Sequence, residues 1–137
     1  MSVKVKRSTI CGVRRDCSTI GGRAANRGVV TFISGGALRV DQWAAEIVIE
    51  VRSERQKRLL QIIGGIQLVI ARPFPSQPNR WPMEARRHYE KILQKADRII
   101  ETSDDPYAAW KLQKRNEWMV DNSGAIIAVP SVLSSMV

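Results

Sequence analysis

The fold class follows most directly from one stretch, Val29-Val-Thr-Phe-Ile-Ser-Gly-Gly-Ala37. Its first five residues are β-branched or aromatic, which predicts a buried strand ending at Gly35-Gly36. Residues 41–57 follow with apolar side chains at a 3.6-residue period, which predicts a helix with one buried face. A strand, a glycine turn and a helix in this order are typical of phosphate-binding α/β folds. Glycines let the backbone approach an anion, and the first amides of the helix donate to it.

The alternation of strands and helices continues along the chain. The patterns predict strands over residues 66–71, 98–102 and 125–129, helices over 82–96 and 108–122, and a possible strand over 8–13. Four prolines between residues 73 and 82 predict a loop without regular structure there, with Pro82 as the first residue of the next helix. We therefore expect a Rossmann-like three-layer α/β sandwich with a mostly parallel sheet of four to five strands.

The length of 137 residues fits one domain with two short ends. Residues 1–28 are basic, rich in glycine and poor in apolar periodicity, so we expect an irregular segment in which the first helix is missing or degenerate. Residues 29–130 form the expected Rossmann-like domain, and residues 131–137 form a tail. If no helix covers residues 29–33, the exposed apolar side of that strand favours self-association.

Composition narrows the classes of partner. The formal net charge is +9, from 22 basic and 13 acidic residues, which favours anionic partners, both nucleotides and nucleic acids. Cys11, Cys17 and the single His88 match no metal-binding or redox spacing, so we predict neither a metal site nor a cofactor. No apolar run reaches the ~20 residues of a membrane span. We therefore predict a cytoplasmic protein without a membrane partner.

Three segments together resemble one known family. They are Thr31-Phe-Ile-Ser-Gly-Gly-Ala-Leu-Arg-Val-Asp-Gln-Trp-Ala-Ala-Glu46, Pro73-Phe-Pro-Ser-Gln77 with Arg80-Trp-Pro82, and Gln113-Lys-Arg-Asn-Glu-Trp-Met-Val-Asp121. In this order they resemble the YpsA-like (prophage YoqJ-like) family of the SLOG superfamily over about residues 29–129. The resemblance implies a Rossmann-like sheet that recognises a nucleotide or nucleotide derivative, such as ADP-ribose or NAD, at the carboxyl ends of its strands.

The resemblance also implies roles for the glycine turn. The backbone of residues 34–37 (Ser34, Gly35, Gly36 and Ala37) would cradle phosphate. Asp41, at the start of the following helix, would either cap that helix or hold a ribose hydroxyl.

Two further segments supply candidate ligand contacts. Gln77 and Trp81 lie in the proline-rich loop, where the Trp81 ring would stack on a base or cover the core. Arg115 and Asn116 lie on the last helix, and the planar guanidinium of Arg115 suits phosphate. The alternative for Arg115 is a surface salt bridge with Glu117 or Asp121.

The sequence departs from the family pattern in the glycine turn and near the N-terminus. Arg39 replaces a family glycine, so it either costs about 1 kcal/mol in backbone strain or adds a charge beside the phosphate. Cys11-Gly-Val-Arg14 resembles the family's first turn with valine in place of histidine, which leaves Arg14 as a weaker candidate contact.

A third departure follows Val129. The chain lacks a glycine-rich second phosphate loop there, and it lacks the catalytic glutamate that related nucleotide phosphoribohydrolases take from that loop. We therefore predict no catalytic residue, and we expect a copy truncated at both ends, of prophage or mobile-element origin.

Two functions remain open at this point. The first is a nucleotide-binding domain without catalysis. The alternative is a nucleic-acid-binding module, because a DNA-processing protein with a Rossmann-like domain belongs to the same superfamily and the chain is strongly basic. A small enzyme acting on a nucleotide ranks below both, because no paired acid and base flank the turn.

Overall fold

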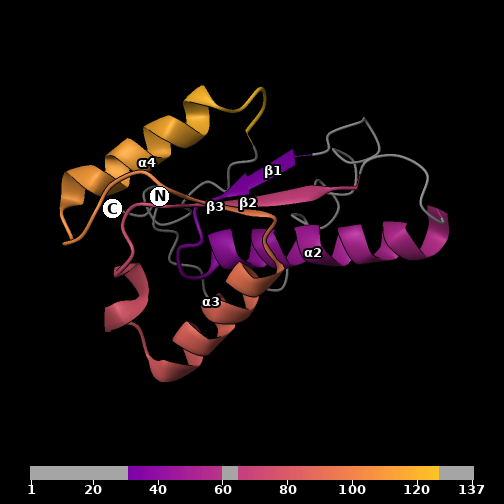
Figure 1. The fold of residues 1–137 in the computed structure, drawn as a ribbon, viewed down its shortest axis with the longest axis horizontal. Helices are drawn as coiled ribbons and strands as arrows, with labels where there is room; N and C mark the ends of the chain where they lie inside the picture. The colour runs from indigo at the N-terminus through magenta and orange to yellow at the C-terminus, as the bar shows by residue number, and fades with distance from the viewer. Residues whose placement is uncertain (1–30, 60–64, 127–137) are drawn as a thin grey trace, which may run out of the picture.

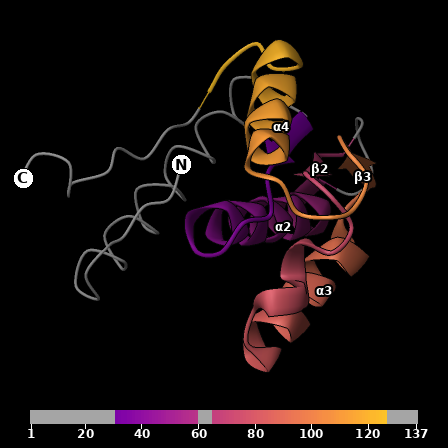
Figure 2. The same ribbon diagram turned by 90° about the vertical axis from the view of Figure 1, so that its left-hand side faces the viewer.

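A computed structural model describes residues 31–59 and 65–126. Its centre is a parallel sheet in the order β1-β2-β3, built from β1 (Thr31–Ser34), β2 (Gln67–Arg72) and β3 (Arg98–Glu101). Helices α2 (Val40–Leu59) and α3 (Met83–Lys95) lie on one side of the sheet, and α4 (Ala109–Asp121) lies on the other (Figures 1 and 2). This mixed α/β arrangement confirms the expected Rossmann-like sandwich.

The central strand β2 is apolar on both faces because helices cover both of them. Leu68 and Ile70 are fully buried and pack with Ala45 and Val48 of α2 and with Ile92 of α3. Side chains alternate along a strand, so the intervening Val69 and Ala71, also buried, point toward α4. A continuous apolar run is the expected pattern for such a strand.

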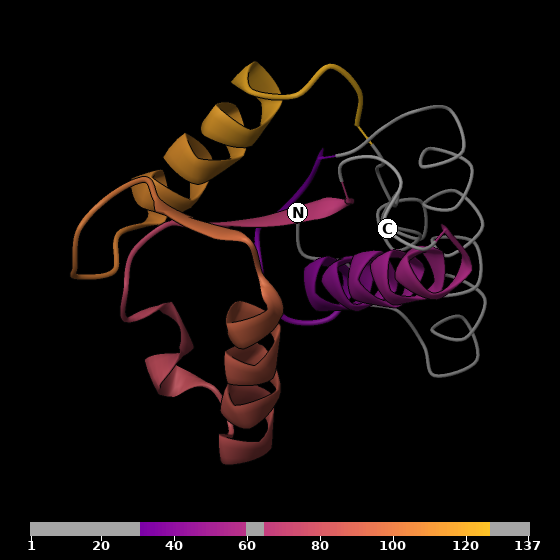
Figure 3. The same ribbon diagram turned by 45° about the vertical axis from the view of Figure 1, so that its right-hand side comes forward.

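Helix α4 packs on the sheet in a different way. Its two buried side chains are Lys111 and Arg115, whereas Trp110 is 60% exposed and Val120 is 54% exposed. Trp118 and Met119 are half-buried. The helix therefore presents charged groups to the interior, and Figure 3 shows it standing apart from α2 and α3.

The prediction of a loop without regular structure after β2 was wrong. Residues Gln77–Arg80 form a short 3₁₀ helix, η1, in which the Asn79 amide donates to Ser76 O (3.0 Å) and the Trp81 amide donates to Pro78 O (3.0 Å). Pro78 fixes its own φ near the value that such a turn needs, so the proline-rich segment is ordered locally. Pro82 lies one residue earlier than predicted, as the residue before α3.

Several predictions fall outside the described residues. They are the strand over 8–13, the contact at Arg14, the irregular segment 1–28 and the tail 131–137. Of the strand over 125–129, only Ala125 and Ile126 are described, and both are exposed without regular structure. The fourth and fifth strands therefore stay predictions. Within the described ranges no helix is long and apolar enough to cross a membrane, and no group of three or more His, Cys, Asp or Glu side chains is placed to hold a metal ion.

Candidate functional site

The glycine turn follows β1 at the carboxyl edge of the sheet, on the left of Figure 1. The buried Ser34 hydroxyl donates to Asp41 O (2.7 Å) and accepts from the Gly36 amide (3.3 Å). The buried Gln42 amide group donates to Gly36 O (3.4 Å). Side chains from the strand end and from the first turn of α2 therefore fix the backbone of the turn.

Both glycines lie in close contact with side chains of the surrounding helices. A Cβ on Gly35 would lie 2.5 Å from Arg115 Nη1 and 2.7 Å from Asp41 Oδ2. Gly36 has a positive φ of 67°, and a Cβ there would lie 2.9 Å from Tyr89 Cε2. The turn is therefore enclosed by side chains from α2, α3 and α4.

Arg115 is 5% exposed and points from α4 toward the turn. Its Nη1 donates to Gly35 O (2.8 Å), and its Nε donates to Asn116 Oδ1 (2.9 Å). Burial excludes the surface salt bridge, and Glu117 instead accepts from Gln113 Nε2 (3.2 Å). Two of the five guanidinium N–H donors thus have acceptors within the described part of the chain.

Asp41 contacts the turn and does not cap the amides of its own helix. Its Oδ2 accepts from the amide of Ala37, three residues before α2 begins (3.3 Å). Burial raises the pKa of Asp41, and the opposing effects of Arg115 and of the Ala37 amide are smaller. Burial likewise lowers the pKa of Arg115, with Asp41 opposing it. A carboxylate and a guanidinium therefore share a partly desolvated site on the turn.

Tyr89 connects the proline-rich segment to the turn, and sequence reasoning missed this role. It is 1% exposed, its hydroxyl donates to Gln77 Oε1 (3.5 Å), and its ring meets that of Trp81 edge to face with centroids 5.2 Å apart. Burial raises its pKa, which the nearby Arg72 guanidinium opposes. Gln77 and Trp81 thereby reach the turn through Tyr89.

Lys111 organises the loops around the site and was also missed. It is 8% exposed, and its Nζ donates to Asp104 O (2.5 Å) and Pro106 O (2.7 Å) in the loop after β3. That loop holds the proline-rich segment through the Ser76 amide, which donates to Asp105 Oδ1 (2.8 Å). The only signal in the sequence is the spacing of four between Lys111 and Arg115, which places both on one face of α4.

Arg39 takes the left-handed backbone conformation that the family glycine implies. Its φ is 74°, its side chain is exposed, and its carbonyl accepts from the Trp43 amide (2.8 Å) as α2 begins. The expected strain is therefore present at this position.

Comparison with known proteins identifies the family. The YpsA family model, described as "YspA SLOG family", matches residues 22–130. The chain belongs to this family. A UPF0398 protein of Brevibacillus brevis is 32% identical over 98 residues, which is 71% of this chain and 48% of that protein. The "Uncharacterized SPbeta prophage-derived protein YoqJ" of Bacillus subtilis (strain 168) is 35% identical over 109 residues, covering 72% of this chain and 59% of that protein.

A UPF0398 protein of Halalkalibacterium halodurans shows similar coverage, with 32% identity over 103 residues, 74% of this chain and 50% of that protein. The chain thus spans about half the length of the curated relatives it matches. The matched region contains the glycine turn, the proline-rich segment and α4, so every contact described above lies within the YpsA family match.

Proposed function

We propose that this chain is a binding domain for a nucleotide or nucleotide derivative, such as ADP-ribose or NAD, with the phosphate on the glycine turn. The observation that carries the proposal is the buried guanidinium of Arg115, 2.8 Å from Gly35 O. Burying a charge is costly unless it is paired, and a guanidinium fork matches the geometry of phosphate. The proposal is binding, and it assigns no reaction to the chain.

The surroundings of the turn support a nucleotide over a free anion. Asp41 lies beside the turn and accepts hydrogen bonds, which suits a ribose hydroxyl. Trp81 is half-buried on Tyr89 and offers an aromatic surface at the same edge of the sheet. Asn116 holds the Nε side of Arg115, which directs the remaining donors of the guanidinium.

We propose further that the chain derives from a prophage or another mobile element. The support is the similarity to the Bacillus subtilis protein whose name describes it as prophage-derived.

The test is isothermal titration calorimetry with ADP-ribose, NAD and AMP on the wild type and on Arg115→Ala. We expect a stoichiometric complex with at least one of them and a loss of affinity of about tenfold or more in the variant, because a hydrogen bond to a charged group contributes about 1.5–3 kcal/mol. Lys114→Ala, which removes an exposed charge from the adjacent position, is the control and should bind like the wild type.

Gly35→Ala supplies a second, independent variant. Its Cβ would displace Arg115 and Asp41, whereas a Cβ on Gly124 meets nothing within 4 Å. Gly35→Ala should lose binding and Gly124→Ala should not. Equal affinities for the wild type, Arg115→Ala and Gly35→Ala would refute the assignment of the turn.

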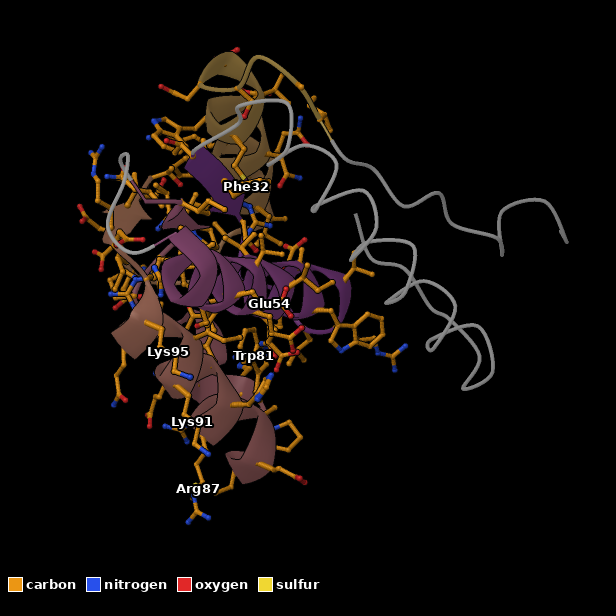
Figure 4. All side chains as sticks on the ribbon, turned by 90° about the vertical axis from the view of Figure 1, so that its right-hand side faces the viewer. Phe32, Glu54, Trp81, Arg87, Lys91 and Lys95 are labelled. Carbon is orange, nitrogen blue, oxygen red and sulfur yellow. The ribbon has the colours of Figure 1, made fainter. Side chains whose placement is uncertain are left out.

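The alternative function, a nucleic-acid-binding module, has its own observation. Arg87, Lys91 and Lys95 repeat at every fourth position of α3, all three are exposed, and Figure 4 shows them extending from that helix. Single-stranded DNA bound along this row would dissociate steeply as salt rises, because each neutralised phosphate releases counterions. Affinity for DNA that falls in Arg87→Ala but not in Arg115→Ala would favour this function over the first.

A further inference from the structure

Arg72 ends the central strand directly beside the glycine turn. Ser34, the last residue of β1, pairs with Ile70 of β2, and Arg72 ends β2 two residues farther toward the same carboxyl edge. Side chains alternate along a strand, so Arg72 leaves the sheet on the face of Ile70, which is the face covered by α2 and α3. Arg115 reaches the same turn from α4 on the opposite face.

The guanidinium of Arg72 contacts the Glu101 carboxylate and the Tyr89 hydroxyl. Its Nε donates to Glu101 Oε1 (3.0 Å), and its Nη2 bonds the same oxygen. The side chains of Arg72 and Glu101 are 19% and 38% exposed, so this ion pair lies near the surface, where a ligand can compete with it. Its backbone is fixed, because Arg72 O accepts from the Thr102 amide (3.1 Å).

Tyr89 lies between Arg72 and the turn. Its Cε2 is 2.9 Å from the position that a Cβ on Gly36 would take, and it packs against Trp81. The site therefore holds two guanidinium groups, one on each face of the sheet edge, and each has a carboxylate beside it. Asp41 accompanies Arg115, and Glu101 accompanies Arg72.

We infer that Arg72 is a second anion-binding residue of this site and that the ligand is a diphosphate. One phosphate lies on the turn and Arg115, and the next replaces the Glu101 carboxylate on Arg72. The inference rests on the proposed function, since it adds a second phosphate contact to the same site. A planar guanidinium can bind a phosphate in place of a carboxylate without rearrangement, because both anions present two oxygens to its paired N–H donors.

The test compares AMP with ADP by isothermal titration calorimetry at constant ionic strength. The wild type should bind ADP about tenfold or more tightly than AMP. Arg72→Gln should reduce the affinity for ADP to that for AMP and leave AMP unchanged. Glu101→Gln should increase the affinity for ADP and leave that for AMP unchanged, because it removes the carboxylate that pairs with Arg72. Arg98→Gln, which removes an exposed charge at the other end of β3, should change neither nucleotide.

The outcomes separate this inference from the function on which it rests. Equal affinities for AMP and ADP, with AMP still dependent on Arg115, would overturn the second contact alone. The second contact would also be overturned if Arg72→Gln lowered the affinities for AMP and ADP equally, or if Arg98→Gln lowered the affinity for ADP as much as Arg72→Gln does. If the wild type binds neither AMP nor ADP, this inference fails, and the proposed function is then decided by the titrations with ADP-ribose and NAD. If Arg72→Gln does not fold, Glu101→Gln decides the question.

Discussion

The two faces of the sheet hold their helices by different forces. On the α2 and α3 face, Leu68 and Ile70 pack against apolar side chains of both helices. On the α4 face, the helix is anchored by Lys111 and Arg115, whose charged ends bond loop and turn carbonyls. The face covered by α2 and α3 stabilises the fold mainly by burying apolar surface. The face covered by α4 positions charged groups at the carboxyl edge of the sheet. The apolar face and the charged edge can therefore be altered separately, and the variants below test that separation.

The largest expected loss comes from the apolar face. Ile70→Ala removes a fully buried side chain and should lower the free energy of unfolding by about 2–5 kcal/mol. Ile99→Ala is the matched control, because Ile99 lies level with Ile70 in β3 but is 42% exposed. Urea denaturation followed by circular dichroism measures both. Similar losses in the two variants would contradict the assignment of the core.

A smaller loss is expected from the charged face. Arg115→Met removes the hydrogen bond to Gly35 O and leaves the half-buried Asp41 without its counter-charge, which should cost about 1–3 kcal/mol. The double variant Arg115→Met/Asp41→Asn should regain part of that loss, because it no longer buries an unpaired carboxylate. Strictly additive losses in this double-mutant cycle, measured by urea denaturation, would show that the two groups do not interact.

Arg39 tests backbone strain at the start of α2. Arg39→Gly places the residue type that tolerates φ = 74° at this position and should raise stability by about 0.5–1 kcal/mol. The melting temperature in differential scanning calorimetry reports the gain. If Arg39 instead contributes a charge to the site, the variant loses affinity for ADP with no gain in melting temperature.

The smallest effect concerns pH. Burial raises the pKa of Asp41 above its reference value of 3.8. As the pH falls, the Asp41 carboxylate is therefore protonated in the folded chain before it is protonated in the unfolded chain. Desolvation of this carboxylate lowers the free energy of unfolding at neutral pH, and that loss is regained as the pH falls from the raised pKa toward 3.8. Protonated Asp41 competes less for Arg115, and binding of sulfate, which stays a dianion, should strengthen by a few-fold. The check is a titration with sulfate at constant ionic strength, in which Asp41→Asn shows no such rise.

The contrast between the apolar face and the charged face of the sheet also explains how much of the structure the sequence could predict. Apolar periodicity identified the three strands and the three α-helices that the structure describes, because burial of apolar side chains leaves a regular pattern, but it missed the 3₁₀ helix η1. It could not identify the roles of Lys111 and Tyr89, because their partners are backbone carbonyls and side chains brought together only by the fold. The glycine turn was predictable from its two glycines, whereas its enclosure by Arg115, 80 residues away in sequence, required the structure.

The most direct test of the central claim is a titration of the ¹⁵N-labelled chain with ADP, followed by the amide resonances of Gly35, Gly36 and Ala37. We expect these three amides to shift saturably with one dissociation constant, and we expect Arg115→Ala to raise that constant about tenfold or more. The central claim is contradicted if ADP leaves the three resonances unmoved, or if it moves only those of α3.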